Sequence, residues 1–524
     1  MRNKDGGLVS CEGARALDLE ASADWGLEPF ALVEAAGRSC AAVFVENFLK
    51  GNKGINFFTV LAGSGNNAAD ALVMLKALIL GGYAAASDCQ VFVTRPAADG
   101  KNPLSRAMLA IQKLGVQTME WDPQKASAAF SKTNYIIDGI TGTGLNSPLR
   151  NTALEMVEAV NQHINKVNAI NIKRKKINKP LVISIDIPSG NFDNWQQDMP
   201  IITADATLAI EPQKLCLYTP MARPHAGTIL PVNGIFPSEL SRKYRGAELV
   251  TWENACAAVP AIAKTAHKYK RGLVEIWAGS PGATGAAKLA ALGAQSAGAG
   301  LIRLIVDPSI YPLVAPACSG VMAVPGPATD GRFTPTTVLL GPGWGKSEDR
   351  IRILENSLRL EERGAPLILD ADAIALAKDI VFHGNAIMTP HIGEFAAYSG
   401  LQKDEILRSP IKALRDFSAK AKAVILLKSH VMYVASPDGR LGIIDGMNPV
   451  LAAGGTGDVL AGFCSSISAR WRACDPGSFD AYACACAAGA LLMQASKTIA
   501  GKFVDPSEIA RAASAIAGAA WLEA

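Results

Sequence analysis

The hydrophobic pattern of this chain repeats a short apolar run followed by a segment of helical spacing. The runs are rich in β-branched and aromatic residues, whereas the segments between them place apolar residues near every third or fourth position. Strands alternating with helices in this way predict a parallel sheet covered on both faces. The strands expected in the first half, after a largely helical stretch from residue 1 to about 55, are Phe57–Ala62, Gln90–Thr94, Tyr135–Asp138, Leu181–Asp186 and Ala206–Ile210.

The alternation loosens and then restarts in the middle of the chain. Polar residues accumulate between Asn233 and Lys270, which is typical of a boundary between domains. The chain has 524 residues, too many for one ordinary core. The pattern therefore predicts a two-domain α/β protein, with domains over residues 1–240 and 245–524. The strands expected in the second domain include Leu273–Ala278, Leu301–Val306, Leu367–Asp372 and Val424–Lys428.

Composition and charge narrow the classes of function. Hydrophobic residues make up 49% of the chain, which indicates a globular protein, and the net charge of +4 is too small to indicate nucleic-acid binding. The basic run Lys173–Lys176 lies among polar residues and is interpreted as a solvated loop. The most apolar stretch, Ala481–Met493, is shorter than the roughly 20 residues that cross a bilayer. It predicts a buried helix, and no membrane association is expected.

Cysteine usage favours a cytoplasmic protein. The ten cysteines are scattered without the spacing of a metal site, and reduced thiols are the simplest explanation. No apolar segment typical of a secretory signal follows Met1.

The chemistry-bearing stretch is Gly454-Gly-Thr-Gly-Asp458, which comes directly before an apolar run of helical spacing. Glycines at a helix start expose N–H groups at the positive end of the helix dipole, where a phosphate can approach closely. Asp458 beside that anion hole would accept a proton from a hydroxyl during phosphoryl transfer. The alternative is a glycine-rich turn in which Asp458 only caps the helix.

Three polar, glycine-rich turns follow predicted strands of the first half: Gly63–Asn67, Asp138–Gly144 and Asp186–Gly190. Carboxyl ends of parallel strands share one edge of a sheet, so these turns are expected to form one ligand site. Asn67, Asp138 and Ser189 would bring an amide, a single carboxylate and a hydroxyl together there. This ligand set suits K⁺ better than a divalent metal. The alternative is that the three side chains only cap turns.

The motifs of the second half, in this order, resemble the nucleotide-dependent NAD(P)HX dehydratases of the ribokinase-like superfamily. The motifs are Gly279-Ser…Thr284-Gly-Ala-Ala287, Gly341-Pro-Gly-Trp-Gly345, Leu369-Asp-Ala-Asp372, Thr389-Pro-His-Ile-Gly-Glu394, Leu427-Lys428 and Gly454-Gly-Thr-Gly-Asp458. The first half resembles the NAD(P)HX epimerases, through the three turns described above. Both halves in one chain resemble the bifunctional enzymes that repair NADHX and NADPHX, the hydrated forms of NADH and NADPH. This resemblance implies a Rossmann-like domain followed by a ribokinase-like domain.

The resemblance also implies roles in the second half. Asp458 would be the catalytic base and would touch the substrate, with ADP or ATP as phosphoryl donor. The substrate would further contact Ala287, Gly343 and His391, although His391 could instead be structural. The nucleotide would be bound by Lys428, Ser429, His430, Val431, Met432, Gly455 and Gly457. The residue after Lys428 departs from the family, which favours glycine there. Asp370 and Asp372 could hold Mg²⁺ or cap a helix, and the capping role is favoured for Asp372.

In the first half the resemblance implies an epimerase site. Asp186 would be catalytic and bind substrate, and Asn67, Asp138 and Ser189 match potassium ligands. The other substrate contacts would be Asn66, Asn67, Ala68, Ala69, Asp70, Gly142, Thr143, Gly144, Leu145, Asn146, Ser147 and Pro148. The family has glycine where this chain has Ala68 and Ala69. If the backbone needs positive φ there, alanine alters the pocket, whereas a need for small size alone tolerates it.

Two other hypotheses about the function remain open. The first half could be a binding module without catalysis, or the chain could be a ribokinase-like kinase of a small alcohol. A homo-oligomer is also expected.

Overall fold

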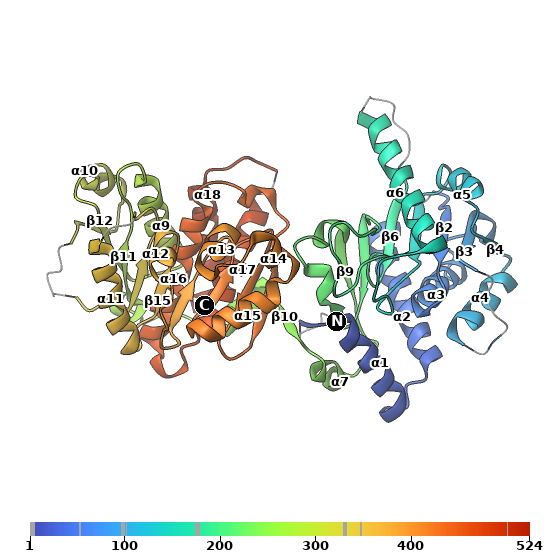
Figure 1. Ribbon diagram of the computed structural model, residues 1–524, viewed down its shortest axis with the longest axis horizontal. Helices are drawn as coiled ribbons and strands as arrows, with labels where there is room; N and C mark the ends of the chain where they lie inside the picture. Colours follow the sequence, from blue (N-terminus) through green and yellow to red (C-terminus); the bar gives the residue numbers. More distant parts are fainter. Residues whose placement is uncertain are drawn as a thin grey trace. The chain divides into compact units, whose positions relative to one another are not determined.

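The computed structural model describes residues 6–51, 54–95, 100, 102–172, 179–327, 333–345, 348–499 and 501–523. The basic run Lys173–Lys176 lies outside these residues. The chain divides into two compact units, Met1–Glu248 and Leu249–Ala524, whose elements are labelled in Figure 1.

The first unit begins with a short strand that the hydrophobic pattern did not predict. Strand β1 (Gly7–Val9) pairs with β8 (Gln213–Lys214) and with residues Ala247 and Glu248 of β10 (Ala247–Leu249). Three residues are too few to show a period, so the prediction of helix from residue 1 was wrong here. Helices α1 (Cys11–Asp24) and α2 (Pro29–Phe44) then follow, as predicted, and the second runs into the helical turn Val45–Leu49.

A parallel sheet forms the centre of the first unit, with strand order β4-β3-β2-β5-β6-β7-β9. Its strands are β2 (Phe58–Ala62), β3 (Cys89–Val93), β4 (Gln117–Glu120), β5 (Tyr135–Gly139), β6 (Leu181–Ile185), β7 (Ala206–Ile210) and β9 (Thr228–Val232). The five predicted strands are present. Strand β4 was missed because Gln-Thr-Met-Glu contains no apolar run, which fits its place at the sheet edge.

Helices cover both faces of this sheet, which confirms the doubly wound arrangement. Val60 packs with α2, α3 (Asn66–Leu80) and α4 (Pro103–Lys113), whereas its neighbour Leu61 packs with α5 (Pro123–Phe130) and α6 (Asn151–Ile172). Successive strand residues point to opposite faces, so a strand buried on both sides is apolar throughout. The short helix α7 (Ser238–Lys243) lies near the end of the unit.

The second unit contains another mainly parallel sheet, with strand order β13-β12-β11-β14-β15-β16-β17-β18-β19. Strands β11 to β17 are parallel to their neighbours, and β18 and β19 are added antiparallel. The strands are β11 (Leu273–Trp277), β12 (Leu301–Val306), β13 (Met322–Pro325), β14 (Thr337–Leu340), β15 (Leu367–Leu369), β16 (Ala386–Met388), β17 (Val424–Leu427), β18 (Val431–Ala435) and β19 (Leu441–Asp445).

Four long helices of the second unit share one core cluster with the sheet: α9 (Thr284–Ser296), α16 (Thr456–Cys474), α17 (Ala481–Thr498) and α18 (Pro506–Trp521). Helix α17 is the buried helix that the apolar stretch predicted. None of the helices in the described part of the chain is both long enough and apolar enough to cross a membrane. The other helices are α8 (Trp252–Ala258), α10 (Tyr311–Val314), α11 (Glu348–Glu362), α12 (Asp372–Leu376), α13 (Ile392–Ser399), α14 (Lys403–Arg408) and α15 (Pro410–Ala421).

Helices α9 and α16 approach each other through glycines. A Cβ on Gly293 would lie 2.5 Å from the carbonyl oxygen of Val459, and a Cβ on Gly462 would lie 2.3 Å from that of Ala290. Only hydrogen fits at both positions, so this contact fixes where α16 begins.

We predict that the second unit folds alone, because it has its own sheet and its own core. A truncated protein starting at residue 245 should be monodisperse and should unfold in urea in one cooperative transition. Circular dichroism and size-exclusion chromatography provide the measurement, with the full chain as control. Aggregation of the truncated protein while the full chain stays dispersed would contradict the prediction.

Candidate active sites

Helix α16 begins at a glycine that no other residue could replace without strain. Gly455 is the N-cap, with φ of 101° in the left-handed region, and a Cβ there would lie 2.4 Å from the Leu289 Cδ1 atom. No side chain among the described residues caps this end. The hydroxyl of Thr456 instead donates to the carbonyl oxygens of Leu451 and Ala453, both at 3.0 Å. The N–H of Thr456 donates to the Ala453 oxygen at 3.4 Å, so the N–H groups of Gly457 and Asp458 are the donors that this helix start offers to an anion.

Asp458 lies in the first turn of α16, and Gly455, not Asp458, occupies the N-cap position. The pKa of Asp458 is raised to about 7: burial raises it most, the nearby Asp370 and Glu394 carboxylates also raise it, and Lys428 lowers it. A carboxyl group with a pKa near neutrality is suited to accept a proton from a hydroxyl. The alternative in which Asp458 caps the helix is wrong, because Gly455 is the N-cap. The raised pKa of Asp458 agrees with the role of a catalytic base.

Lys428 lies close to three carboxylates of this site, those of Asp370, Glu394 and Asp458. Its Nζ lies 2.7 Å from Asp370 Oδ1, which also accepts from the Thr389 hydroxyl at 2.7 Å, and 3.8 Å from Glu394 Oε2. Burial would lower the pKa of Lys428, but Asp370, Glu394 and Asp458 outweigh burial and raise it. The lysine is therefore charged at neutral pH.

The small size of Gly457 is explained by the same lysine. A Cβ on this residue would lie 3.2 Å from Lys428 Nζ, so glycine lets the ammonium group approach the start of α16. A cation and free N–H groups converge at one point, as expected where phosphate charge is stabilised.

His391 has a structural role in this fold. It is the N-cap of α13, and its Nδ1 accepts from the N–H groups of Gly393 at 2.9 Å and Glu394 at 3.2 Å. Its own N–H donates to Glu394 Oε2 at 2.8 Å, which completes a capping box. The side chain is still 60% exposed. Nδ1 is occupied, so the predicted substrate contact would use Nε2, which lies 3.5 Å from Glu394 Oε1.

The remaining positions predicted at this site form two packed turns. Asp372 accepts from the N–H of Gly345 at 2.7 Å and so holds the glycine turn after β14, while Ala371 is the N-cap of α12. Gly343 has φ of 54°, and a Cβ on it would lie 2.7 Å from the Ala283 Cβ. Ala287 is fully buried in α9. Asp372 is thus structural, though not as the helix cap that was expected.

A cavity of about 480 Å³ lies beside Lys428 and the start of α16. Of the predicted nucleotide-binding residues, Lys428, Ser429, His430, Met432 and Gly457 line it. Gly455 and Val431 are not among the lining residues, and Val431 is buried within β18. The rest of the lining was not predicted to bind nucleotide: Gly446, Met447, Asn448, Pro449, Leu451, Ala452, Thr456, Leu460 and Leu492. The Asn448–Pro449 pair, a typical turn signal after a strand, could have indicated this loop.

In the first unit, Asp186 follows strand β6 with φ of 64°, an uncommon conformation for a residue with a side chain. Its Oδ1 lies 2.6 Å from Lys214 Nζ, which also donates to the carbonyl oxygen of Ile210. Burial raises the pKa of Asp186, although Lys214 lowers it. Burial likewise raises the pKa of Asp18 to about 6 and that of Asp70 well above its ordinary value.

One lysine thus serves three buried carboxyl groups, and burial raises the pKa of each of them. Asp18 and Lys214 were not predicted from the sequence. Asp18 lies on the amphipathic helix α1, and Lys214 lies in a strand too short to show a period.

A cavity of about 670 Å³ contains these groups and most of the predicted epimerase residues. Asn66, Asn67, Asp70, Gly142, Thr143, Gly144, Leu145 and Asp186 line it, together with Asp18 and Lys214. Asn146, Ser147 and Pro148 follow in the chain but are not part of the lining. Ala68 and Ala69 are fully buried within α3, which begins at Asn66. Their backbone is helical, so these positions need no positive φ and alanine fits the loop without backbone strain.

The three predicted potassium ligands meet beside this cavity. Asp138 is completely buried, and its carboxylate accepts from the hydroxyls of Ser184 and Ser189 and from the Ser189 N–H. Asn67 donates to the carbonyl oxygen of Thr141 at 2.9 Å, and the Thr141 N–H donates to Ser189 Oγ at 2.8 Å. Burial raises the pKa of Asp138, and no lysine or arginine among the described residues pairs with it. A monovalent cation would compensate this buried charge.

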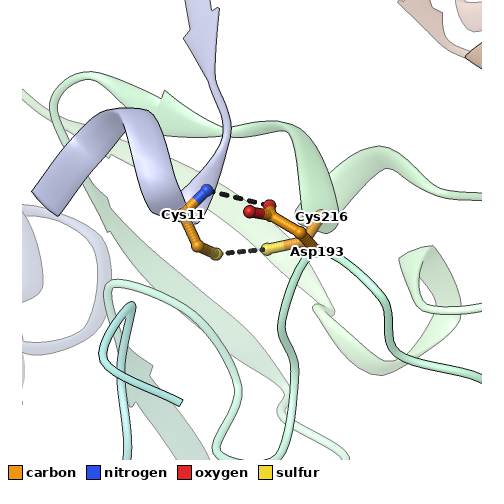
Figure 2. Close-up of side chains that lie close together, drawn as sticks. All are labelled: Cys11, Asp193 and Cys216. Carbon is orange, nitrogen blue, oxygen red and sulfur yellow. Dashed lines mark hydrogen bonds between the residues drawn. The ribbon is translucent and has the colours of Figure 1, made fainter. Parts of the chain in front are cut away.

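One group of side chains in the described part of the chain has the spacing of a metal site, and it lies elsewhere in the first unit. Cys11 and Cys216 have their Sγ atoms 3.6 Å apart, and Asp193 lies beside them (Figure 2). Both oxygens of Asp193 accept from backbone N–H groups of the first turn of α1, those of Cys11 and Glu12. Thiol groups do not suit K⁺ or Mg²⁺. This cluster therefore fastens the start of α1 and is not the predicted potassium site.

Comparison with known proteins covers both units. Residues 274–516 match the family model described as NAD(P)H-hydrate dehydratase, and residues 29–216 match the model described as YjeF-related protein N-terminus. The bifunctional NAD(P)H-hydrate repair enzyme of Gloeobacter violaceus is 31% identical over 96% of this chain and 97% of its own length. The corresponding enzyme of Salinibacter ruber is 28% identical, with 88% of each chain covered.

A solved structure also matches the second unit. The ADP/ATP-dependent NAD(P)H-hydrate dehydratase from Bacillus subtilis, co-crystallised with ATP/Mg²⁺, aligns with 51% of this chain and 96% of its own at 24% identity and a TM-score of 0.46.

The order of the two matched units and the full-length similarity agree with the paired sites described above. The chain belongs to the family of bifunctional NAD(P)H-hydrate repair enzymes.

Proposed function

We propose that this chain repairs hydrated NADH and NADPH: its first unit interconverts R- and S-NAD(P)HX, and its second unit dehydrates S-NAD(P)HX with ADP or ATP. The observation that carries the second activity is the convergence of Asp458, Lys428 and the uncapped start of α16 on one point. The substrate carries a hydroxyl at C6 of the reduced nicotinamide ring. Hydroxide leaves poorly, whereas a phosphorylated hydroxyl leaves as phosphate.

The residues of the second unit divide this reaction between them. Asp458 takes the proton from the C6 hydroxyl as its oxygen attacks the terminal phosphorus of the nucleotide. The N–H groups at the start of α16 and the Lys428 ammonium group stabilise the charge that develops on the phosphoryl oxygens. Phosphate then leaves C6, a proton is lost from C5, and the ring double bond of NAD(P)H is restored. Asp370 keeps Lys428 charged and in place.

We propose that Mg²⁺ binds together with the nucleotide, through its phosphates. Asp370 is already paired with Lys428, and Asp372 holds a backbone N–H, so neither carboxylate is free to form a metal cage. Mg²⁺ commonly binds through phosphates and water with few protein ligands, and would here offset phosphate charge. The ADP or ATP would occupy the cavity beside Lys428.

For the first unit, the support comes from the carboxyl groups around Lys214. Asp186, paired with Lys214 Nζ at 2.6 Å, would offer a base beside C6, and Asp18, with a pKa of about 6, would offer an acid. The alternative in which this unit only binds ligand relied on Ala68, Ala69 and Ala71. All three lie in helix α3, where alanine causes no backbone strain. The other alternative is that the chain is a kinase of a small alcohol. That hypothesis would give no function to the carboxyl groups and the cavity of the first unit.

We further propose K⁺ at Asn67, Asp138 and Ser189, because Asp138 is a buried carboxylate without a cationic partner among the described residues. A cytoplasmic location is proposed with it, supported by ten cysteines that are all unpaired. A homo-oligomeric state completes the proposal, and sedimentation velocity measures it directly.

The first test replaces the base of the second unit. Asp458→Asn keeps the shape and removes the proton acceptor, so the rate of dehydration should fall by about 10²-fold or more while nucleotide still binds. Recovery of reduced-nicotinamide absorbance from S-NADHX measures the rate, with ADP and ATP tried in turn. Asp416→Asn, an exposed aspartate on α15, is the matched control. Near-normal turnover in Asp458→Asn would sink the assignment.

The pH dependence of the same reaction follows from the raised pKa of Asp458, which is about 7. The base works only when ionised, so kcat/KM should fall about tenfold per pH unit below that pKa and level off above it. The profile is measured between pH 5 and 9. A flat profile across pH 7 would show that Asp458 does not accept the proton.

The potassium proposal is tested on epimerisation. The conversion of R- to S-NADHX should be faster in potassium than in lithium chloride at equal ionic strength, and Asp138→Ala should lose this difference. Thermal unfolding of the same variant, followed by circular dichroism, serves as the folding control. Equal epimerisation rates of the unaltered protein in both salts would remove K⁺ from the reaction.

A further inference from the structure

Two cysteines of the first unit come together through the register of two short strands. Strand β1 pairs in parallel with β8, and the last pair of that ladder is Val9 with Lys214. Cys11 and Cys216 each follow their member of this pair by two positions, so the ladder brings both to the same level. Their Sγ atoms lie 3.6 Å apart, although the residues are 205 positions apart in the chain. Local spacing in the sequence therefore could not indicate this pair of thiols.

A carboxylate lies beside the two thiols. Cys11, Cys216 and Asp193 each place one possible ligand atom within 4.8 Å of the others (Figure 2). Asp193 is held there by the N–H groups of Cys11 and Glu12, which lie 2.8 Å and 3.2 Å from its two oxygens. A carboxylate has about four lone-pair sites, so two hydrogen bonds leave capacity for a cation. The third ligand is thus positioned before any ion binds.

The geometry and exposure of the three side chains agree with a tetrahedral metal site. An ion with bonds of about 2.3 Å to sulfur holds two thiolates about 3.8 Å apart, close to the observed 3.6 Å. A disulfide would bring the sulfur atoms to about 2.0 Å and would give the carboxylate no role. Both cysteines are 1% exposed, whereas Asp193 is exposed. Solvent therefore reaches the group on the side of the carboxylate.

We propose that Cys11, Cys216 and Asp193 bind one thiophilic divalent cation of the Zn²⁺ type, with water as the fourth ligand on the exposed side. Two thiols select such an ion over K⁺ and Mg²⁺, the cations proposed for the two active sites. On binding, each thiol releases its proton to solvent, and two metal–sulfur bonds and one metal–oxygen bond form. The ion reaches the sulfur atoms past Asp193.

The bound ion would connect two segments that carry charged residues of the first-unit cavity. Helix α1 begins at Cys11 and carries Asp18, and Lys214 lies two positions before Cys216. Asp18 and Lys214 line the cavity of about 670 Å³, whereas none of the three ligands is in its lining. The ion would therefore hold the two segments together without touching the substrate, and its binding would stabilise the folded first unit.

The test uses Co²⁺ as probe, because it occupies Zn²⁺ sites and absorbs light when bound by thiolates. The full chain is kept reduced with a phosphine, stripped with a chelator and then titrated with Co²⁺. The first equivalent should give a thiolate-to-metal charge-transfer band in the near ultraviolet, and added Zn²⁺ should remove that band. Zn²⁺ should also raise the Tm of the stripped protein. None of these readouts depends on epimerisation or dehydration, so the proposed activities are tested separately.

Variants assign the band to the three residues. Changing an outer group around a metal typically weakens binding 10- to 100-fold, so losing a sulfur ligand in Cys11→Ser or Cys216→Ser should weaken it at least about 100-fold. Asp193→Asn keeps both thiols and an oxygen for the helix N–H groups, and should weaken binding at least about tenfold. Cys474→Ser, at an exposed cysteine of the second unit, is the matched control. Circular dichroism checks that each variant is folded.

Two results would overturn the proposal. One is the absence of a charge-transfer band at the first equivalent of Co²⁺. If protein isolated without reductant then contains a Cys11–Cys216 disulfide, the pair is a redox couple and not a metal site. The other is a band of equal strength and affinity in the unaltered chain, in Cys216→Ser and in Asp193→Asn, which would place the ion at other cysteines.

Discussion

The close contact between helices α9 and α16 is the constraint on which the second unit depends. Gly293 and Gly462 leave no room for a Cβ, so the two helix backbones touch and the position of α16 is fixed. That position sets the place of the anion hole, because Gly455, Gly457 and Asp458 are the first residues of the same helix. Rigid elements hold a catalytic group more accurately than a loop does. The chemistry of the second unit is therefore a consequence of helix packing.

Each unit places several buried carboxyl groups around a single lysine. Each collects buried carboxyl groups at the carboxyl ends of parallel strands and gives them one lysine, Lys428 with Asp370 in one unit and Lys214 with Asp186 in the other. The lysine Nζ lies 2.7 Å from Asp370 in the second unit and 2.6 Å from Asp186 in the first. The carboxyl groups farther from it, Asp458 and Asp18, have pKa values raised toward neutrality by burial. Groups that exchange protons near pH 7 arise from this unequal sharing of one positive charge.

The sequence by itself determined the elements and the chemistry at their ends. Buried parallel strands must be apolar on both faces, which is why β2, β5 and β6 could be predicted to within a residue or two, and why the turns after them were recognised as a site. Short or edge strands such as β1 and β4 carry too few apolar residues to be seen.

Only the tertiary structure decided which lysine pairs with which carboxylate, and which backbone conformation each position adopts. Lys214 and Asp186 are 28 residues apart and Lys428 and Asp370 are 58 apart, and no local pattern relates them. The helical start at Asn66 showed that Ala68 and Ala69 need no glycine, and the capping box showed that His391 is already half occupied. Such facts depend on distances across the fold, because pKa, burial and hydrogen-bond partners are properties of neighbours in space.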